Sequence, residues 1–398
     1  MSLDLNKVAE QIGAMVSDLV AGRREKQVRL EQAMGLLNSV DLNILKKKVA
    51  NSRTTWLVAG IVDDISGSHP SPPTPEEFTV LATDGSHIDV DRHRNARCFL
   101  INIGTVLIKY GKNPEAILES YPRLYSNNNE LVIKSPDPRE RDKMIEGTLL
   151  NIKRSVEELS YLVRMGENLP EGITSLALLD GSLILWGLTD NSYPEFVHEE
   201  LLQKGALEQL NRLKTLNENR SIPLASYISF PRSSDVVNIL RIAVCPHDVV
   251  DTDIHCKTCK SHECEAFDVL QDRDIFGAML RSGDRSALFS STSSIMKRYG
   301  DHRIYFFYLN AGDEVARIEI PEWVAVDKKL LDICHALVVD QCRRGNGYPV
   351  VLSEAHEQAV VTASDREYFW ELVEELMVKQ RLPPAGSAKS QSKRTRWI

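Results

Sequence analysis

The chain has 398 residues, of which 42% are hydrophobic and 26% are charged, the composition of a folded globular protein rather than of a disordered one. Its 56 acidic residues outnumber the 48 lysines and arginines, and the net charge of −8 excludes a generally basic nucleic-acid coat. Any contact with phosphate groups therefore needs a local basic surface or a bound cation.

The lack of an evident targeting signal and the low cysteine content both favour the cytoplasm. No apolar run reaches the roughly 18 residues that a bilayer-spanning helix requires, and the start MSLDLNKVAE does not resemble a secretory signal. Seven cysteines, several of them clustered, are too few for a secreted disulfide scaffold. We therefore expect a cytoplasmic protein with no membrane contact.

Apolar periodicity predicts helices and strands in an order typical of an α/β protein. Residues 2–50 show helical spacing and are a candidate dimer arm, and a proline-rich loop follows at 69–77. The next predicted elements are strands at 78–90 and 98–110, a charged helix at 138–166 and a buried strand at 173–188. Strand, long helix and buried strand together indicate an α/β fold with a mixed β-sheet flanked by helices.

The second half of the chain continues the alternation. It predicts a helix at 194–219, a strand at 227–230, a helix from 233, strands at 303–310 and 314–320, and helices at 327–341 and 353–379. We expect an N-terminal helical region at 1–55, a main domain at 56–380 with a cysteine-rich insertion near 245–265, and a disordered basic tail at 381–398.

Two Asp-Gly-Ser motifs lie in apolar strands, one at Asp84 and one at Asp180. An unpaired carboxylate is costly to bury. If the two strands are neighbours, the carboxylates converge and repel, and a divalent cation with hard oxygen ligands resolves the conflict. The alternative is that each aspartate caps a turn or a helix, with glycine supplying a positive φ. The residues alone leave both readings open.

The segment GYPVVLSEAHEQAVV contains Tyr348 and His356 near the expected start of the last helix. We expect His356 in the first turn of that helix. An isolated histidine is more often an ordinary surface or core residue, so its importance depends on whether this helix lies near the two aspartates.

Together, the ATDGS strand, the LLDGSL strand after a long glutamate-bearing helix, and the Tyr-Pro-x-x-Leu-x-x-Ala-His-Glu run resemble the NurA nuclease family over roughly residues 50–380. The resemblance implies an RNase H-like core and a homodimer. It also implies a Mn²⁺-dependent DNA nuclease, with 5′–3′ exonuclease and single-strand endonuclease activity, that processes DNA ends in double-strand break repair. The partner that it implies is a hexameric HerA-type ATPase.

Carried over residue by residue, the resemblance makes Asp84 and Asp180 metal ligands and makes Tyr348 and His356 active-site residues. It also implies a glutamate from the helix before Asp180, where Glu158 fits best, Glu157 is next and Glu146 is a third candidate. An imidazole ligand favours Mn²⁺ over the harder Mg²⁺, which stays an alternative.

A separate motif, CPHDVVDTDIHCKTCKSHECEAF, contains four cysteines with the spacing C-x10-C-x2-C-x4-C: Cys245, Cys256, Cys259 and Cys264. The central C-x2-C is the spacing of a zinc half-site, and tetrahedral Zn²⁺ needs four such ligands. The sequence thus suggests a structural zinc site, and the alternative is a polar loop with incidental cysteines.

The basic segment RHRNAR follows the first aspartate strand, so Arg92, Arg94 and Arg97 are candidates for DNA-backbone contact, as is the basic tail. Such runs are often solvated surface. Two other functions remain: a catalytically silent subunit that binds DNA or the ATPase, and an actin-like phosphotransferase. The latter needs glycine-rich phosphate loops, which the sequence lacks.

Overall fold

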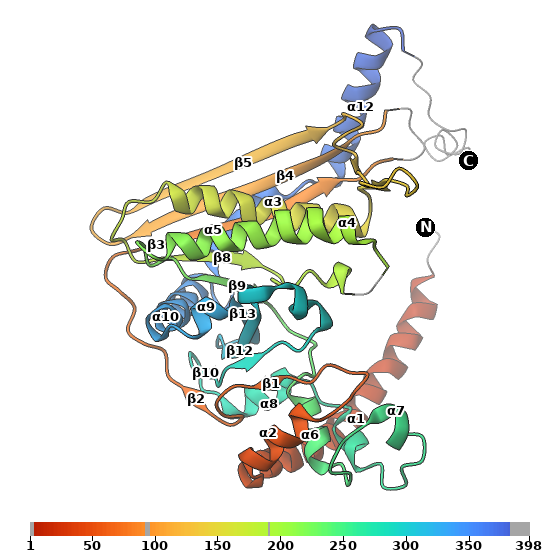
Figure 1. Cartoon of the computed structure of the whole chain (residues 1–398), viewed down its shortest axis with the longest axis vertical. Coiled ribbons are helices and arrows are strands. Elements are labelled where there is room, and N and C mark those ends of the chain that lie inside the picture. The colour runs from red at the N-terminus through yellow and green to blue at the C-terminus, as the bar shows by residue number, and fades with distance from the viewer. Residues whose placement is uncertain (1–3, 92–95, 190–191, 383–398) are drawn as a thin grey trace. The chain divides into compact units, whose positions relative to one another are not determined.

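A computed structural model of the protein describes residues 4–91, 96–189 and 192–382 (Figure 1). The chain forms two compact units, each assembled from segments that are distant in the sequence. The first unit comprises Met1–Ser71, Ile228–Met296 and Arg303–Ile318, and the second comprises Pro72–Tyr227, Lys297–His302 and Glu319–Ile398. The expected boundaries at residues 55 and 380 stay a prediction.

The second unit is built around a mixed sheet in the order β9-β8-β3-β4-β5. Its strands are β3 (Phe78–Ile88), β4 (Phe99–Tyr110), β5 (Glu115–Tyr125), β8 (Ser175–Asp180) and β9 (Leu224–Ile228), and a small separate pair is formed by β6 (Val132–Ile133) and β7 (Lys143–Met144). β3, β4 and β5 are antiparallel, whereas β8 runs parallel to both β3 and β9. The expected α/β fold, with a mixed sheet flanked by helices, is confirmed.

Burial explains why these segments form central strands. In β3, the run Val80, Leu81 and Ala82 is fully buried, as expected for a strand covered on both faces. In contrast, β5 is exposed along nearly its whole length and lies at the end of the strand order. The sequence analysis did not predict β5, because its residues lack a buried apolar pattern.

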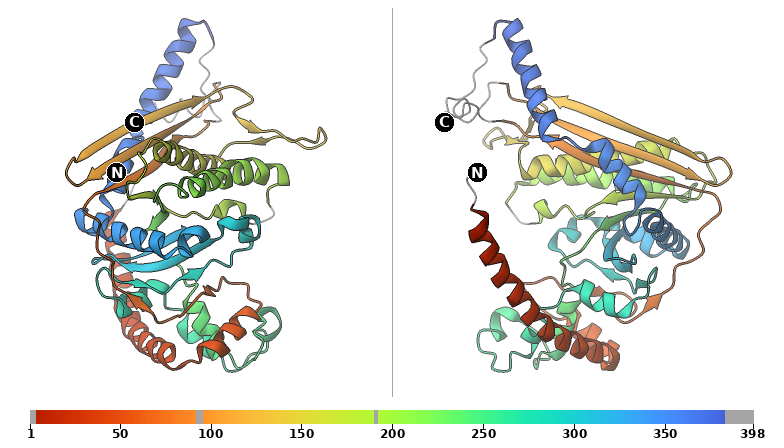
Figure 2. Two further views of the ribbon diagram at one scale, coloured as in Figure 1. Left: turned by 60° about the vertical axis from the view of Figure 1, so that its left-hand side comes forward. Right: turned by 180° about the vertical axis from the view of Figure 1, so that it is seen from behind.

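Helices cover both faces of this sheet. On one face lie α3 (Thr148–Glu167), α4 (Glu195–His198), the π-helix η2 (Glu199–Leu207) and α5 (Glu208–Leu216), as Figure 1 shows. The other helical segments of the unit are η1 (Trp186–Leu188), η5 (Gly300–His302), α9 (Glu322–Ala325), α10 (Lys328–Arg344), α11 (Val350–Ala359) and α12 (Ala363–Lys379). Viewed from behind in Figure 2, the blue C-terminal helices cross the opposite face of the long strands.

Three expected elements differ in extent from the observed ones. The helix expected at 353–379 is two helices, because Thr362 starts α12 with a capping box that it forms with Asp365. The helix expected from residue 138 begins only at Thr148, after Gly147 with a φ of 55°. The strand expected at 173–188 ends at Asp180, where Gly181 turns the chain with a φ of 86°.

The first unit contains a small antiparallel sheet and the N-terminal helices. Its sheet has the order β1-β11-β12-β13, and β10 pairs with β12 and β2. Its elements are α1 (Leu5–Ser39), α2 (Leu42–Ala50), β1 (Gly60–Ile61), β2 (Ser68–His69), α6 (Val237–Val244), α7 (Thr252–His255), η3 (Glu263–Phe267), α8 (Asp272–Met279), β10 (Arg285–Ser286), β11 (Phe289–Ser290) and β12 (Ile304–Asn310). The elements η4 (Ser294–Arg298) and β13 (Val315–Pro321) begin in it.

The helix expected at 2–50 is therefore interrupted. Asp41 caps the N-terminus of α2 by accepting from the backbone N–H groups of Asn43 and Ile44. Ala33 and Leu37 of α1 are buried in the core of the unit, whereas apolar residues in the first half of α1, such as Ile12 and Leu19, are exposed. Across the described ranges, no helix combines the length and apolar character needed to cross a membrane.

Candidate active site

The two Asp-Gly-Ser motifs lie on neighbouring strands. β3 and β8 pair in parallel with Thr83 opposite Leu179, so the residues that follow, Asp84 and Asp180, extend the same register. The pKa of Asp180 is raised, first because the surrounding protein removes water from its carboxylate and second because of the charge of Asp84. The residue still keeps solvent-accessible surface at the end of its strand.

Helix α11 brings His356 to the first aspartate. The Nδ1 atom of His356 lies 2.8 Å from Oδ2 of Asp84, and the other carboxylate oxygen of Asp84 accepts from the backbone N–H of Gly85 at 2.7 Å. The His356 side chain is 62% exposed, so the rest of its ring faces solvent. The sequence predicted His356 in the first turn of this helix. Because α11 begins at Val350, His356 lies in the second turn instead.

Tyr348 meets the second aspartate. It lies between α10 and α11, and its side chain makes a hydrogen bond with Asp180 that lowers the pKa of that carboxylate, as does the backbone N–H of Gly181. The Tyr348 ring packs edge-on against Tyr227 of β9, with 5.3 Å between ring centroids. The two C-terminal residues thus reach different aspartates.

Glu158 approaches from α3 and is 7% exposed. Its pKa is raised to about 8, mainly by burial. The charge of Arg154 opposes this rise, whereas the charges of Asp84 and Asp180 contribute to it. Arg154 Nε lies 3.1 Å from Oε1 of Glu158. Among the described residues, neither of these two atoms has a hydrogen-bond partner of good geometry, so the pair is an ion pair without an aligned bond.

The other two candidate glutamates make different contacts. Glu157 accepts hydrogen bonds from the Tyr125 hydroxyl at 3.1 Å and from Lys153 at 3.2 Å. Glu146 precedes α3 and its N-cap, Gly147. Of the three, Glu158 is the one whose pKa is set in part by both aspartates.

Gly85 lets α3 approach β3 closely. A Cβ atom at this position would lie 2.5 Å from Oε1 of Glu158 and 2.8 Å from Cγ of Arg154. Two residues earlier, the Thr83 hydroxyl donates to the backbone carbonyl of Glu158 at 3.0 Å. The glycine of the first motif therefore provides the space for the Glu158 carboxylate, a role that the sequence analysis did not assign.

The opposite face of β3 holds the C-terminus of α11. The Ser86 hydroxyl donates to the Ala359 carbonyl at 2.5 Å. Buried Asn102 of β4 donates through Nδ2 to the carbonyls of Gln358 at 3.2 Å and Ala359 at 2.9 Å. At Gly104, a Cβ atom would lie 2.3 Å from the carbonyl oxygen of Ala355, so only glycine allows this packing. These contacts fix the helix that carries His356.

The loop after Asp180 is fixed by Glu319, which is buried in β13. Its carboxylate accepts from the Ser182 hydroxyl at 2.7 Å and from the backbone N–H of Leu183 at 3.0 Å. The Tyr299 hydroxyl donates to the Leu183 carbonyl at 3.0 Å and accepts from the backbone N–H of Leu185 at the same distance. A polar residue inside an apolar strand, such as Asn102 or Glu319, was the available sequence signal for these roles.

The donor set matches a hard divalent cation in its chemistry. Three carboxylates and one imidazole suit Mn²⁺ or Mg²⁺, and Oε1 of Glu158 is a buried acceptor in the space that Gly85 leaves open. Within the described chain, however, no three histidine, cysteine, aspartate or glutamate side chains have the mutual positions of a formed metal site. The carboxylates are electrostatic neighbours, and they are held by Tyr348, His356 and Arg154.

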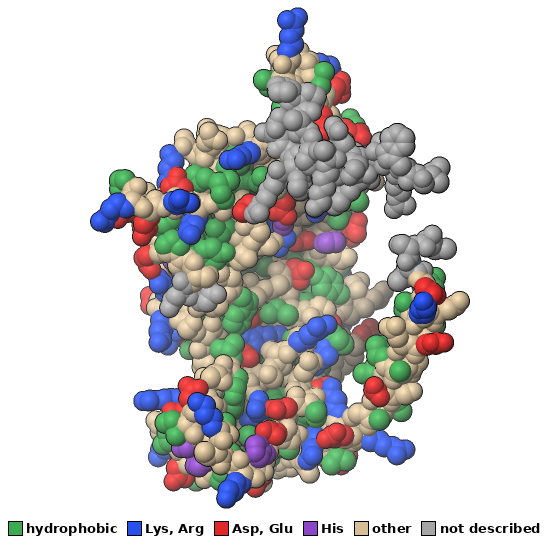
Figure 3. Space-filling view, turned by 90° about the vertical axis from the view of Figure 1, so that its right-hand side faces the viewer, with side chains coloured by type: hydrophobic (Ala, Val, Ile, Leu, Met, Phe, Trp, Pro, Cys, Tyr) green, Lys and Arg blue, Asp and Glu red, His purple; other side chains and the backbone are tan. Residues whose placement is uncertain are grey.

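The remaining predicted residues lie elsewhere. Arg92 and Arg94 fall outside the described residues, as does the tail from 383 onward, whereas Arg97 is exposed just before β4. The four cysteines of the C-x10-C-x2-C-x4-C motif all belong to the first unit. Figure 3 shows that basic and acidic side chains are intermixed on the face that it displays, in agreement with the absence of an overall basic character.

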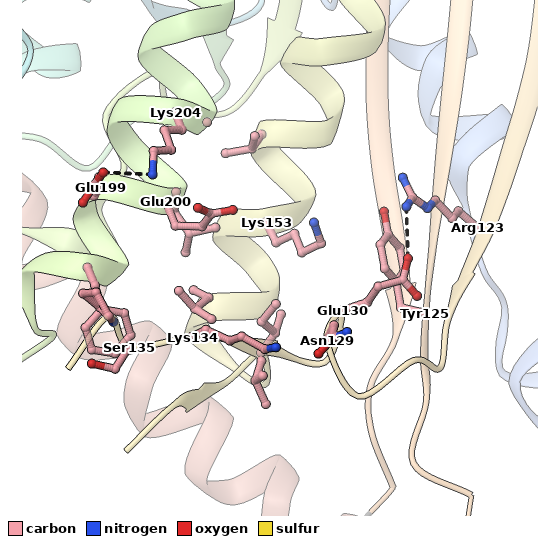
Figure 4. Close-up of a pocket in the computed structure, with 18 residues that line it drawn as sticks. Arg123, Tyr125, Asn129, Glu130, Lys134, Ser135, Lys153, Glu199, Glu200 and Lys204 are labelled. Carbon is pink, nitrogen blue, oxygen red and sulfur yellow. Dashed lines mark hydrogen bonds and ion pairs between the residues drawn. The ribbon is translucent and has the colours of Figure 1, made fainter. Parts of the chain in front are cut away.

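A cavity of about 660 Å³ lies beside α3, between β5, η2 and the loop around residue 134 (Figure 4). Three of its four lysine and arginine side chains form ion pairs: Arg123 with Glu130 at 3.2 Å, Lys153 with Glu157 at 3.2 Å, and Lys204 with Glu199 at 2.8 Å. None of the five predicted nuclease residues lines it. This cavity is therefore separate from the aspartates.

Comparisons with known proteins identify the family of the chain. The family model described as the NurA domain matches residues 78–361, which is more than half of the chain. Among solved structures, the crystal structure of the NurA nuclease from Sulfolobus solfataricus matches at 15% identity and a TM-score of 0.45, covering 91% of this chain and 98% of that one. LC9-RNase H1, a type 1 RNase H with the type 2 active-site motif, matches at 8% identity and a TM-score of 0.21, over 43% of this chain and 72% of that one. A comparison with curated proteins found no match. The chain belongs to the NurA domain family.

Proposed function

We propose that the protein is a metal-dependent deoxyribonuclease that hydrolyses phosphodiester bonds at the Asp84–Asp180 edge of the sheet. The observation that carries this proposal is the 2.8 Å contact between His356 and Asp84, next to the strand that ends in Asp180. The function implied by the family match at residues 78–361 supports it.

The metal ligands in this proposal are Asp84, Glu158, Asp180 and His356. A bound divalent cation supplies an activated water and neutralises negative charge on the phosphodiester oxygens. We propose Mn²⁺ as the natural ion because the set includes an imidazole, with Mg²⁺ as the alternative. Among these ligand atoms, the buried Oε1 of Glu158 would be stabilised most by a bound ion, because no described group makes a well-aligned hydrogen bond to it.

The side chains of the chain divide the remaining work. When Nδ1 of His356 donates its proton to Asp84, Nε2 keeps a lone pair on the solvent side, where it binds the ion or takes up and delivers a proton. Tyr348 orients the Asp180 carboxylate through its hydrogen bond. Arg154 holds the Glu158 carboxylate in position through their ion pair while no metal ion is bound.

The finer activity follows the family's expected behaviour. We propose 5′–3′ exonuclease and single-strand endonuclease activity in the cytoplasm, in DNA-end processing during double-strand break repair with a hexameric HerA-type ATPase. Arg97, which is exposed at the start of β4, is a candidate contact to the DNA backbone, together with Arg92 and Arg94. The net charge of −8 means that such local contacts have to provide the attraction.

We also propose a homodimer formed through β5. This strand lies at the end of the sheet and exposes four large apolar side chains: Ile117, Leu118, Tyr121 and Leu124. A long exposed apolar edge strand readily pairs with another chain. A second copy offers an identical edge, so a twofold arrangement satisfies both.

The nuclease proposal is tested with end-labelled linear DNA, single- or double-stranded, incubated with pure protein in Mn²⁺, in Mg²⁺ or in EDTA. We expect degradation with a divalent metal, none in EDTA, and its loss in Asp84→Asn and Asp180→Asn. Asp301→Asn, at a side chain that is 89% exposed in the same unit, is the matched control. Full activity of either site variant would contradict the proposal. DNA binding without degradation by the wild type would indicate a silent subunit, and ATP hydrolysis would indicate a phosphotransferase.

A further inference from the structure

Four cysteines of the first unit lie on elements that the fold brings together. Cys245 is the C-cap of α6, and Cys264 lies in η3, which packs against α6. Cys256 is the C-cap of α7, and Cys259 lies in the loop between α7 and η3. All four are free thiols. Two of the four sulfur atoms are therefore on elements packed against each other, and the other two are on the connection between them.

This connection has no hydrophobic core of its own. From residue 253 to residue 266, no residue is buried, although the segment contains a helix end, a tight loop and a 3₁₀ helix. A small substructure that lacks a core usually needs a metal ion or a disulfide to hold its shape. Since the thiols are free, the segment lacks the stabilising element that its size requires.

The backbone around Cys259 is arranged for a thiolate. The backbone N–H groups of His262 and Ser261 donate to its sulfur atom, and the Ser261 hydroxyl lies 3.6 Å from the same sulfur. His262 adopts a left-handed conformation with a φ of 50°, which turns the chain toward Cys264. N–H groups that point at a cysteine sulfur stabilise its charged form, which is the form that binds metals.

The four thiols are also electrostatic neighbours. Cys264 is close enough to interact electrostatically with Cys245, Cys256 and Cys259, and Cys256 interacts in the same way with Cys245 and Cys259. The four side chains therefore occupy one small region of the unit, as the ligands of a single ion must.

We propose that Cys245, Cys256, Cys259 and Cys264 bind one Zn²⁺ ion as a tetrahedral, structural site. Four sulfur ligands leave no open position for a substrate, so the ion holds the segment together and takes no part in hydrolysis. The sulfur atoms are not gathered around one point in the described structure. Binding therefore requires the exposed connection to close, and it releases the thiol protons as the thiolates form.

The nearby histidines do not replace these ligands. The rings of His247 and His255 stack on each other with 3.9 Å between centroids. The Nδ1 atom of His255 accepts from the backbone N–H of Asp251 at 3.3 Å, and His262 pairs with Glu265 at 2.7 Å. Each of these rings already has a local partner, so we assign the four ligand positions to the thiols.

The test is the zinc content of full-length protein purified under reducing conditions without chelator. We expect one zinc ion per chain in the wild type, loss of that zinc in Cys259→Ser, and retention in Thr258→Ala, whose exposed side chain lies inside the C-x2-C segment. A second measurement uses wild-type protein alone: Co²⁺ added after zinc removal is expected to give the visible absorption of a tetrahedral thiolate site. Absence of zinc together with absence of this absorption would overturn the proposal, as would a disulfide among the four cysteines. Neither outcome depends on nuclease activity, so this inference and the proposed function fail separately.

Discussion

Nδ1 of His356 lies 2.8 Å from Oδ2 of Asp84, although 272 positions separate the two residues in the sequence. The contact exists because β3 and β4 hold α11 by its C-terminus, through Ser86 and Asn102, and because Gly104 removes the side chain that would keep the helix away. The histidine is positioned by residues that do not contact it. This arrangement leads to predictions in which distant variants act through His356.

Replacing Asn102 with alanine is expected to lower DNA cleavage by roughly tenfold to a hundredfold, as for other groups that orient a ligand. The carbonyls of Gln358 and Ala359 lose a buried donor, and α11 shifts. If Asn102 acts through His356, its effect largely disappears when His356 is already alanine, which a double-mutant cycle of cleavage rates measures.

Asn217→Ala is the matched control for that cycle. Asn217 also caps a helix in the second unit: its Nδ2 donates to the carbonyls of Leu213 at 2.9 Å and Ile222 at 2.7 Å. Asn217→Ala and Asn102→Ala should each reduce the free energy of unfolding by an amount on the order of 1–3 kcal/mol. Cleavage by the folded Asn217→Ala protein should stay unchanged. Additive effects of Asn102→Ala and His356→Ala would refute the positioning role.

Gly85→Ala is expected to abolish most activity, because the new Cβ would lie 2.5 Å from Oε1 of Glu158. Relief of that overlap moves either α3 or the carboxylate, at a cost on the order of 1–3 kcal/mol. Gly35→Ala in α1, where no atom lies within 4 Å of the added Cβ, should instead stabilise the protein by up to about 1 kcal/mol. Thermal unfolding and cleavage assays on both variants check this; an active, stable Gly85→Ala protein would contradict it.

Glu319→Gln is expected to weaken the loop that follows Asp180. The Ser182 hydroxyl and the Leu183 N–H both donate to Oε2 of Glu319, and an amide oxygen in its place is uncharged, so both bonds lose their charge assistance. We expect lower cleavage and a loss of stability on the order of 1–3 kcal/mol. Ser182→Ala, which keeps the bond to Leu183, should lie between this variant and the wild type, and a reversed order in unfolding measurements would count against the assignment.

The first unit contains a buried carboxylate whose ionisation should make stability depend on pH. Asp272 accepts from the backbone N–H groups of Val236 and Val237 and from the Tyr308 hydroxyl at 2.6 Å. Its pKa is raised from 3.8 to about 7, mainly by burial, and the charge of Asp235 contributes to the rise. At pH values between the unfolded pKa of 3.8 and the folded pKa of about 7, the folded state binds more protons than the unfolded state. The stability that this proton contributes is therefore fully present below a pH of about 4 and is lost as the pH rises to about 7.

The measurement compares wild type with Asp272→Asn by urea unfolding at several pH values. The stability of the wild type relative to the variant should fall through this window, by at most about 4 kcal/mol, and then level off. Asp18→Asn, at an exposed position of α1, controls for the removal of one carboxylate. A difference that stays constant from pH 4 to pH 8 would be incompatible with a proton held by Asp272.

The proposed dimer predicts that charge on the edge strand separates the subunits. Leu118→Glu combined with Leu124→Glu places two carboxylates on exposed apolar positions of β5, and sedimentation should show a monomer where the wild type is a dimer. Val326→Glu, at a residue that is 72% exposed outside β5, should leave the mass unchanged. A wild-type monomer, or a dimeric double variant, would exclude β5 as the interface.

The sequence predicted the elements whose pattern is local. The strands around Asp84 and Asp180 have continuous apolar runs because helices cover both faces of the sheet, but the sequence left open whether the two strands are neighbours. The sequence could not show that α11 ends at Ala359, because the apolar periodicity does not mark the break before the capping box of α12. It could not show β5 either, because an exposed strand at the end of a sheet has no buried apolar pattern. Asn102 and Glu319 could not be assigned, since a polar residue within a strand reveals its partner only after folding.

The way α11 is held has a consequence for synthesis of the protein. A ribosome releases both aspartate strands and all of residues 229–349 before the helix with His356 emerges. Until then the backbone of Gly104 has no helix against it, and Asp84 lacks its imidazole. A nascent or prematurely terminated chain therefore holds an incomplete candidate site.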